Sequence, residues 1–283
     1  MGLKIITDSG SEITKEVAKE LDVIVLPLNV RFGQEEYQAG VTLSNEEFYN
    51  KLIETDEFPK TSQISPAVYE EVFEEIVEDG DEAIYISISS ELSGTMQSAR
   101  IGAADFEDSI SIVDSRQASV GVNILVKQAC IYRKEGYSRE EIVKKLLWDR
   151  ERIKTIALFD TLEYLKKGGR ISAAAAAIGG VLSIKPVIKI EDGIVKVIGK
   201  AKGSRNGQNK LMEFVKSSRG IDFECPLCLV YTGLEDAMLK KYIADSSILY
   251  EGYMEDLPYV QAGPVIGTYA GPGAIGFAYF EKE

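Results

Sequence analysis

Short apolar runs alternate with helical patterns through the first 160 residues, and this alternation constrains the fold more than any other feature. The runs, most of them rich in Ile and Val, lie at 3–7, 23–28, 83–88, 109–113 and 155–159. Patterns typical of amphipathic helices lie mostly between them, at 13–21, 66–78, 92–104, 118–134 and 139–152. Such alternation is typical of a parallel β-sheet covered by helices. The sequence therefore predicts an N-terminal α/β/α domain over residues 1–159.

A segment near 29–56 departs from this pattern. Residues 30–37 resemble a small hairpin, and residues 45–54 resemble a short helix. We interpret the segment as an insertion near the edge of the parallel sheet. Because Thr61 follows it closely, the insertion could help to cover a site there.

The chain changes in texture near residue 160. Glu191-Asp192-Gly193 separates two apolar runs, 187–190 and 194–199, and this spacing predicts a β-hairpin. Further helices are expected at 160–167, 171–182, 205–218 and 234–244, and further strands at 226–231, 246–250 and 274–280. We therefore predict a C-terminal α+β domain, residues 160–283, with a largely antiparallel sheet.

The charge and the residue inventory exclude several functions. Residues 1–82 hold 20 acidic and 6 basic side chains, a balance of −14 that outweighs the net charge of −13 for the whole chain. Because an acidic surface repels phosphate backbones, we expect no nucleic acid partner. The chain has no histidine, so it can form neither a Ser-His-Asp triad nor a histidine metal site.

The cysteines and the apolar runs complete these exclusions. Cys225 and Cys228 form a C-x-x-C pattern, but an apolar run follows at once and there is no second such pair, so we interpret them as packed strand residues. The chain starts without a basic, apolar leader, and no apolar run approaches 18 residues. We expect a cytoplasmic protein with at most transient membrane contact and with no metal or cofactor.

Two hydroxyl-rich segments, 61–65 and 89–95, stand where loops turn into helices. Pro66 fits the first helical position, and Ser65 can cap the helix. Hydroxyls gathered at helix starts favour a carboxylate or a phosphate, whereas Ser and Thr also cap helices with no ligand. Since Asp8, Ser87 and Asp114 are expected at the carboxyl ends of strands, where open α/β sheets bind ligands, the ligand-site interpretation gains weight.

The segment 263–276 contains five glycines and two prolines. Such density indicates close backbone approach and unusual dihedral angles rather than a packed helix. A phosphate-cradling loop and a turn at a domain interface remain equally open. No Walker-type spacing and no G-x-G-x-x-G after a strand is present, so nucleotide binding by this chain alone has no support.

Taken in order, several segments resemble the DegV family over essentially the whole chain. The matching segments are Ile5–Ser9, Thr61–Gln63, Ser89–Thr95, Val113–Ser115, Tyr164–Ser172, Lys185-Pro186 and Gly263–Gly276. The resemblance implies a two-domain protein that binds a long-chain fatty acid between its domains, with the carboxylate near the surface. It further implies the binding subunit of a bacterial fatty acid kinase, in which a separate ATP-binding subunit forms the acyl phosphate, so the chain itself would not be an enzyme.

The resemblance also assigns site residues. Thr61 and Ser93 match the positions whose hydroxyls hold the carboxylate, and Arg170 matches a buried arginine that orients the site or balances its charge. The remaining residues expected at the head group are Ser62, Gly94, Thr268 and Tyr269. Tyr269 stands where the family usually has a histidine, and a phenol donates a hydrogen bond but carries no positive charge. Lys202 and Arg205 lie where family members present an arginine to the kinase subunit, and a solvated basic loop is the other interpretation.

Two further hypotheses belong to other classes. Asp8 and Asp114 could hold Mg²⁺ for a metal-assisted phosphotransferase or hydrolase, although turn and capping roles are commoner for such aspartates. A regulatory protein is the third hypothesis, which no feature of the sequence supports directly.

Overall fold

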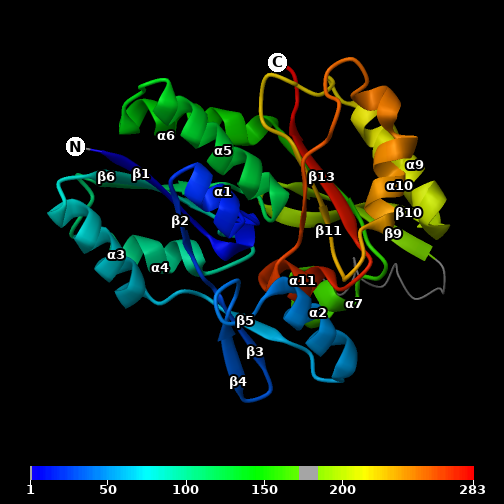
Figure 1. Ribbon diagram of the computed structural model, residues 1–283, viewed down its shortest axis with the longest axis horizontal. Coiled ribbons are helices and arrows are strands. Elements are labelled where there is room, and N and C mark those ends of the chain that lie inside the picture. Colours follow the sequence, from blue (N-terminus) through cyan, green and yellow to red (C-terminus); the bar gives the residue numbers. More distant parts are fainter. Residues whose placement is uncertain (1, 172–183) are drawn as a thin grey trace.

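The computed structural model describes residues 2–171 and 184–283 and contains three β-sheets (Figure 1). The first sheet has the order β2 (Val23–Leu26), β1 (Leu3–Asp8), β6 (Glu82–Ser87), β7 (Ile110–Asp114), and all its strand pairs are parallel. This confirms the predicted parallel sheet for the first four apolar runs.

Helices cover both faces of this sheet. Alternate residues of one strand point to opposite faces, so Ile5 of β1 packs with α5 (Val120–Lys134) and α6 (Arg139–Arg152), whereas Ile6 packs with α3 (Pro66–Glu78) and α4 (Thr95–Gly102). α1 (Lys15–Glu20) joins the face of Ile5. The α/β/α arrangement is therefore confirmed.

The second sheet has six strands, and one of them, β8, contains the fifth apolar run of the sequence analysis. Its order is β10 (Ile194–Lys202), β9 (Ile184–Glu191), β8 (Ile153–Leu158), β13 (Ile275–Phe280), β11 (Cys228–Tyr231), β12 (Tyr259–Gln261). All pairs are antiparallel except β11 with β12. The prediction that the run near 155–159 extends the parallel sheet is wrong, because β8 pairs with β9 and β13 instead.

Helices α9 (Gly203–Ser217) and α10 (Ala237–Asp245) pack with this second sheet and confirm two predicted helices. The expected strand at 246–250 is wrong, since residues Ser247–Leu249 form the 3₁₀ turn η3, in which the Leu249 N–H donates to the Ser246 carbonyl. Cys228 is buried at the start of β11, as expected, whereas the prediction is wrong for Cys225, which is half-buried and lies before the strand. The helix expected at 171–182 lies, apart from residue 171, outside the described residues.

The insertion forms the third sheet, with the order β4 (Glu35–Gln38), β3 (Asn29–Phe32), β5 (Lys60–Ser62) and antiparallel pairs. Its helix α2 (Asn45–Glu54) begins with a reciprocal capping box between Ser44 and Glu47. The hairpin and the helix expected in this segment are therefore confirmed. In Figure 1 this small sheet and α2 lie beside α11 (Pro264–Ala270) and α7 (Glu163–Lys167).

The glycine-rich segment contains a helix, which corrects the sequence prediction. α11 (Pro264–Ala270) packs against α2, α7 (Glu163–Lys167) and η1 (Ser9–Ser11). This close packing requires glycine at position 267, because a Cβ there would lie only 2.5 Å from the Phe48 ring. The glycines that our prediction attributed to unusual backbone lie just after it, where Gly271 and Gly273 have positive φ.

Candidate functional site

An apolar cavity lies where the second sheet, α11 and the loops that follow strands of the first sheet meet. It encloses about 940 Å³ of space, including its open part. β8, β9 and β13 supply Ala157, Ile188 and Ile275, and α11 supplies Ile266. The loop after β6 supplies Ile88 and Leu92. Such a lining favours a ligand with a long apolar part.

Four polar side chains form one cluster in the wall of this cavity: Thr61, Ser93, Arg170 and Tyr269. The Thr61 hydroxyl and the Tyr269 hydroxyl are 2.5 Å apart, and the Arg170 guanidinium lies 4.7 Å from the centre of the Tyr269 ring. Arg170 Nε donates to the carbonyl of Leu92, the residue before Ser93, at 3.1 Å. All four side chains are half-buried, so the cluster lies near the surface.

Four separate segments bring this cluster together. Thr61 lies on β5, Ser93 precedes α4, Arg170 follows α7, and Tyr269 lies on α11. The Tyr269 ring lies directly against the backbone of Gly168. Only glycine fits there, because a Cβ at this position would overlap the ring. Ser93 accepts from the Thr95 N–H at 3.2 Å, and its hydroxyl lies 2.7 Å from that of Thr95. Ser93 therefore binds the backbone N–H of the first residue of α4 and also lines the cavity.

Three other residues expected at the head group do not line the cavity. Ser62 is exposed, and its hydroxyl donates to Glu36 at 3.4 Å. The Thr268 hydroxyl donates to the Pro264 carbonyl within α11 at 2.8 Å. Gly94 is the N-cap of α4, where a Cβ would overlap Gln63. The expected capping of α3 by Ser65 is also wrong, because its side chain makes no cap hydrogen bond, although Pro66 opens the helix as predicted.

The two basic residues expected to face a partner lie elsewhere. Lys202 ends β10 and Arg205 lies in the first turn of α9, and both side chains are exposed. Neither lines the cavity. Their exposure leaves them accessible to another protein.

The aspartates of the phosphotransferase hypothesis have structural partners. The buried Asp8 carboxylate accepts from the N–H groups of Gly10 and Ile88, at 2.9 and 3.0 Å, and from the Tyr85 hydroxyl. Burial raises the pKa of Asp8, while these donors lower it. Asp114 accepts from the Ser90 hydroxyl at 2.6 Å and from the Arg116 N–H at 2.9 Å. Within residues 2–171 and 184–283, no three His, Cys, Asp or Glu side chains gather as a metal site.

The sequence prediction missed three polar residues of the cavity wall: Ser119, Thr155 and Thr232. The Thr155 hydroxyl donates to Gln117, and the Thr232 hydroxyl accepts from the Ala274 N–H at 2.7 Å. Ser119 has a positive φ of 54°, an unusual value for a residue other than glycine. No motif marks these positions, because each lies in or beside an ordinary apolar strand or helix.

Known proteins share this sequence pattern and this architecture. Residues 2–282 match the family model described as "Uncharacterised protein, DegV family". The chain belongs to the DegV family. A DegV domain-containing protein of Caldanaerobacter subterraneus subsp. tengcongensis is 37% identical over 285 residues, which cover 99% of each chain. A DegV domain-containing protein of Clostridium perfringens is 32% identical, with the same coverage.

Solved structures of DegV proteins share the whole fold. A DegV family protein from Thermus thermophilus, described for its fatty acid binding, has a TM-score of 0.87 and 30% identity, with 100% of both chains covered. A stearic acid-binding protein from Eubacterium ventriosum has a TM-score of 0.87 and 26% identity, with 100% and 99% covered. Among the described helices of this DegV chain, none combines the length and the hydropathy that a membrane-spanning helix needs.

Proposed function

We propose that this chain binds a long-chain fatty acid, with the acyl chain in the apolar cavity and the carboxylate at the cluster of Thr61, Ser93, Arg170 and Tyr269. The single observation that carries the proposal is this cluster of donors in the wall of an otherwise apolar cavity. The fatty acid binding of its structural relatives supports it.

The chemistry of the two parts fits such a ligand. Hydrocarbon leaves water with a gain of about 0.8 kcal/mol per buried methylene group, so the cavity favours a long chain. A carboxylate needs donors when it is partly buried, since leaving it unsatisfied is costly. Thr61 and Ser93 offer hydroxyl donors, and Arg170 supplies positive charge beside Tyr269.

Substitution of both Thr61 and Ser93 by alanine tests the proposal. Each hydrogen bond to a charged group contributes roughly 1.5–3 kcal/mol, so the double variant should bind fatty acid on the order of 100-fold more weakly or worse. Ser62→Ala is the matched control, since Ser62 neighbours Thr61 but does not line the cavity. Titration with oleic acid and mass spectrometry of co-purified lipid measure the effect. A folded double variant that binds like the control would refute the assignment.

We further propose that the chain is a carrier without chemistry of its own, which presents the carboxylate to a fatty acid kinase subunit for acyl-phosphate formation. The near-surface position of the polar cluster supports presentation, and the exposed Lys202 and Arg205 are the proposed contacts with that subunit. This proposal gives the chain a cytoplasmic location and at most transient contact with membranes.

A reconstituted reaction tests the carrier role. With ATP and a purified kinase subunit from a bacterium that has DegV proteins, the lipid-loaded chain should yield acyl phosphate. The chain alone, freed of contaminating kinases, should turn over ATP no faster than buffer. Turnover by the isolated chain would favour the phosphotransferase hypothesis instead.

A further inference from the structure

A second, polar hollow lies on the other side of the wall of the apolar cavity. It holds about 880 Å³, including open space, and two residues, Thr155 of β8 and Ile190 of β9, line both hollows. Thr155 and Ile190 are direct partners in the β8–β9 register. At this pair of residues, therefore, the apolar cavity and the polar hollow are separated by a single layer of side chains.

A hydrogen bond closes this layer. The Thr155 hydroxyl donates to Gln117 Oε1 at 2.8 Å, and the two residues are only 6% and 4% exposed. The layer is tightly packed, since a Cβ at Gly121 would lie 2.5 Å from the Thr155 hydroxyl and 2.8 Å from Gln117 Oε1. With both polar atoms paired, the layer needs no water to satisfy them.

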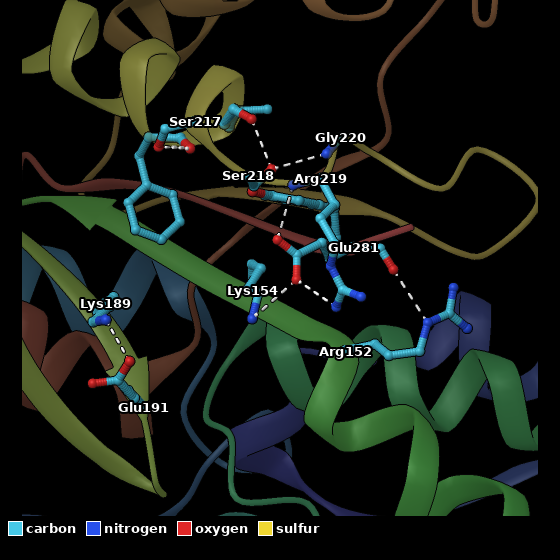
Figure 2. Close-up of polar contacts among 12 residues, drawn as sticks. Arg152, Lys154, Lys189, Glu191, Ser217, Ser218, Arg219, Gly220 and Glu281 are labelled. Atoms are coloured by element: carbon cyan, nitrogen blue, oxygen red, sulfur yellow. Dashed lines mark hydrogen bonds and ion pairs between the residues drawn. The ribbon is translucent and has the colours of Figure 1, made fainter. Parts of the chain in front are cut away.

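The polar hollow is a poor environment for hydrocarbon. Its lining includes Lys154 and Lys189, which pair with Glu281 and Glu191 respectively, as Figure 2 shows. An acyl chain that emerged there would meet ion pairs and water instead of apolar side chains. Each methylene group beyond the layer would therefore lose the gain of burial.

The layer also lies away from the polar cluster along β8. Phe159, just after β8, packs in the same apolar group as Tyr269 and Leu165. Thr155 lies four residues earlier on the extended chain, a separation of about 13 Å at the usual strand rise. An acyl chain that starts at the cluster and follows β8 thus ends at Thr155.

We infer that Thr155, held by Gln117 and flanked by Ile190, forms the end of the acyl-chain cavity and sets the longest fatty acid that the protein accommodates. This inference rests on the proposed fatty acid binding. It identifies Thr155 and Ile190 as residues that determine specificity for chain length, and Gln117 as a residue that positions Thr155.

Binding across a homologous series of saturated fatty acids, from lauric to lignoceric acid, tests the inference. Thr155→Ala removes a methyl group and a hydroxyl, so fatty acids about two carbons beyond the wild-type optimum should bind on the order of tenfold tighter than to wild type. Thr155→Val keeps the volume and should keep the optimum. Thr232→Ala makes the same deletion in a part of the cavity wall that does not border the polar hollow, and it should not move the optimum.

The outcomes separate this inference from the proposed function. If wild type binds no fatty acid of the series, the proposed function fails and the inference falls with it. If wild type binds but Thr155→Ala keeps the wild-type optimum, or Thr232→Ala moves it equally, only the inference is overturned. Should Thr155→Ala not fold, Ile190→Val makes a smaller enlargement at the same layer, and an unchanged optimum there likewise overturns the inference.

Discussion

Tyr269 carries more of the proposed chemistry than any other single residue. Its hydroxyl contacts Thr61, and its ring faces Arg170. A phenol can supply a hydrogen bond but no positive charge. Arg170, stacked on the ring, is then the cation of the described cluster. In the proposed site, the carboxylate thus depends on this phenol and on the guanidinium that lies against its ring.

Tyr269→Phe should weaken fatty acid binding by about 1–3 kcal/mol, because it removes the hydroxyl and keeps the packing of the ring. Tyr259→Phe is the matched control, since its hydroxyl donates to Asp236 and it does not line the cavity. Isothermal titration with oleic acid measures the difference. Equal affinity of Tyr269→Phe and wild type would mean that Tyr269 only fills space.

At the scale of elements, α11 connects the insertion to the cavity. The Tyr49 hydroxyl of α2 donates to the Ala262 carbonyl at 3.0 Å, and Glu12 accepts from the Gly263 N–H at 2.7 Å. One face of α11 supplies Val265, Ile266 and Tyr269 to the cavity. The position of this short helix therefore decides where Tyr269 lies relative to Thr61.

Gly267→Ala should displace α11 and weaken both folding and binding. In an ordinary helix this change stabilises by about 1 kcal/mol. Here the new methyl group would meet the Phe48 ring at 2.5 Å and the Tyr49 hydroxyl at 3.0 Å, so the sign should reverse. Urea unfolding measures the stability, and fatty acid titration measures the binding. A variant more stable than wild type would contradict the close contact of α11 with α2.

Elements with strong local signals could be predicted from the sequence. α3 and α6 begin and end where their patterns and start signals place them, with Pro66 opening one and a Ser138–Glu141 capping box opening the other. α11 could not be predicted, because Gly267 within it and the glycines on either side of it disfavour a helix, whereas its packing against α2, α7 and η1 compensates. The sheet that takes up β8 could not be predicted either, since periodicity identifies a strand but not its partners.

The candidate site divides in the same way. The hydroxyl-rich segments 61–65 and 89–95 form a local pattern, and the resemblance to the DegV family singled out Thr61 and Ser93 within them. Thr155 and Gln117 could not be found in this way, since they are 38 residues apart and meet only in the folded chain. Long-range contacts of this kind leave no signal in a single sequence.

At the scale of the whole molecule, the buried carboxyl group of Glu12 links the segment after β1 to the segment that carries α11. Burial raises the pKa of Glu12 to about 8, while the Gly263 N–H lowers it and the nearby Asp8 raises it. Glu12 is 7% exposed, and its Oε1 has no hydrogen-bond partner among the described residues. A neutral carboxyl group suits this position better than a charged one.

Stability should therefore fall as the pH rises. The folded chain holds the Glu12 proton up to about pH 8 whereas the unfolded chain releases it near 4.5, so this contribution is complete below 4.5 and is lost as the pH approaches 8. Glu12→Gln should flatten the free energy of unfolding between about pH 5 and 8, leaving the part due to Asp8. Urea titrations at several pH values measure it. Glu16→Gln is the control, because the pKa of the exposed Glu16 is lowered and its effect lies at lower pH. If the free energy of unfolding had the same slope against pH in wild type and in Glu12→Gln, the role of Glu12 would be contradicted.

The position of β13 in the second sheet has a consequence for protein synthesis. β13 pairs with β8 on one side and with β11 on the other, although it follows both in the chain. Until the ribosome has added residues 275–280, the edges of β8 and β11 that face each other across this gap stay unpaired, and the wall of the cavity lacks Ile275 and Gly276. A nascent chain can thus complete its first sheet early, but the cavity that we propose for the acyl chain is complete only after translation has passed β13.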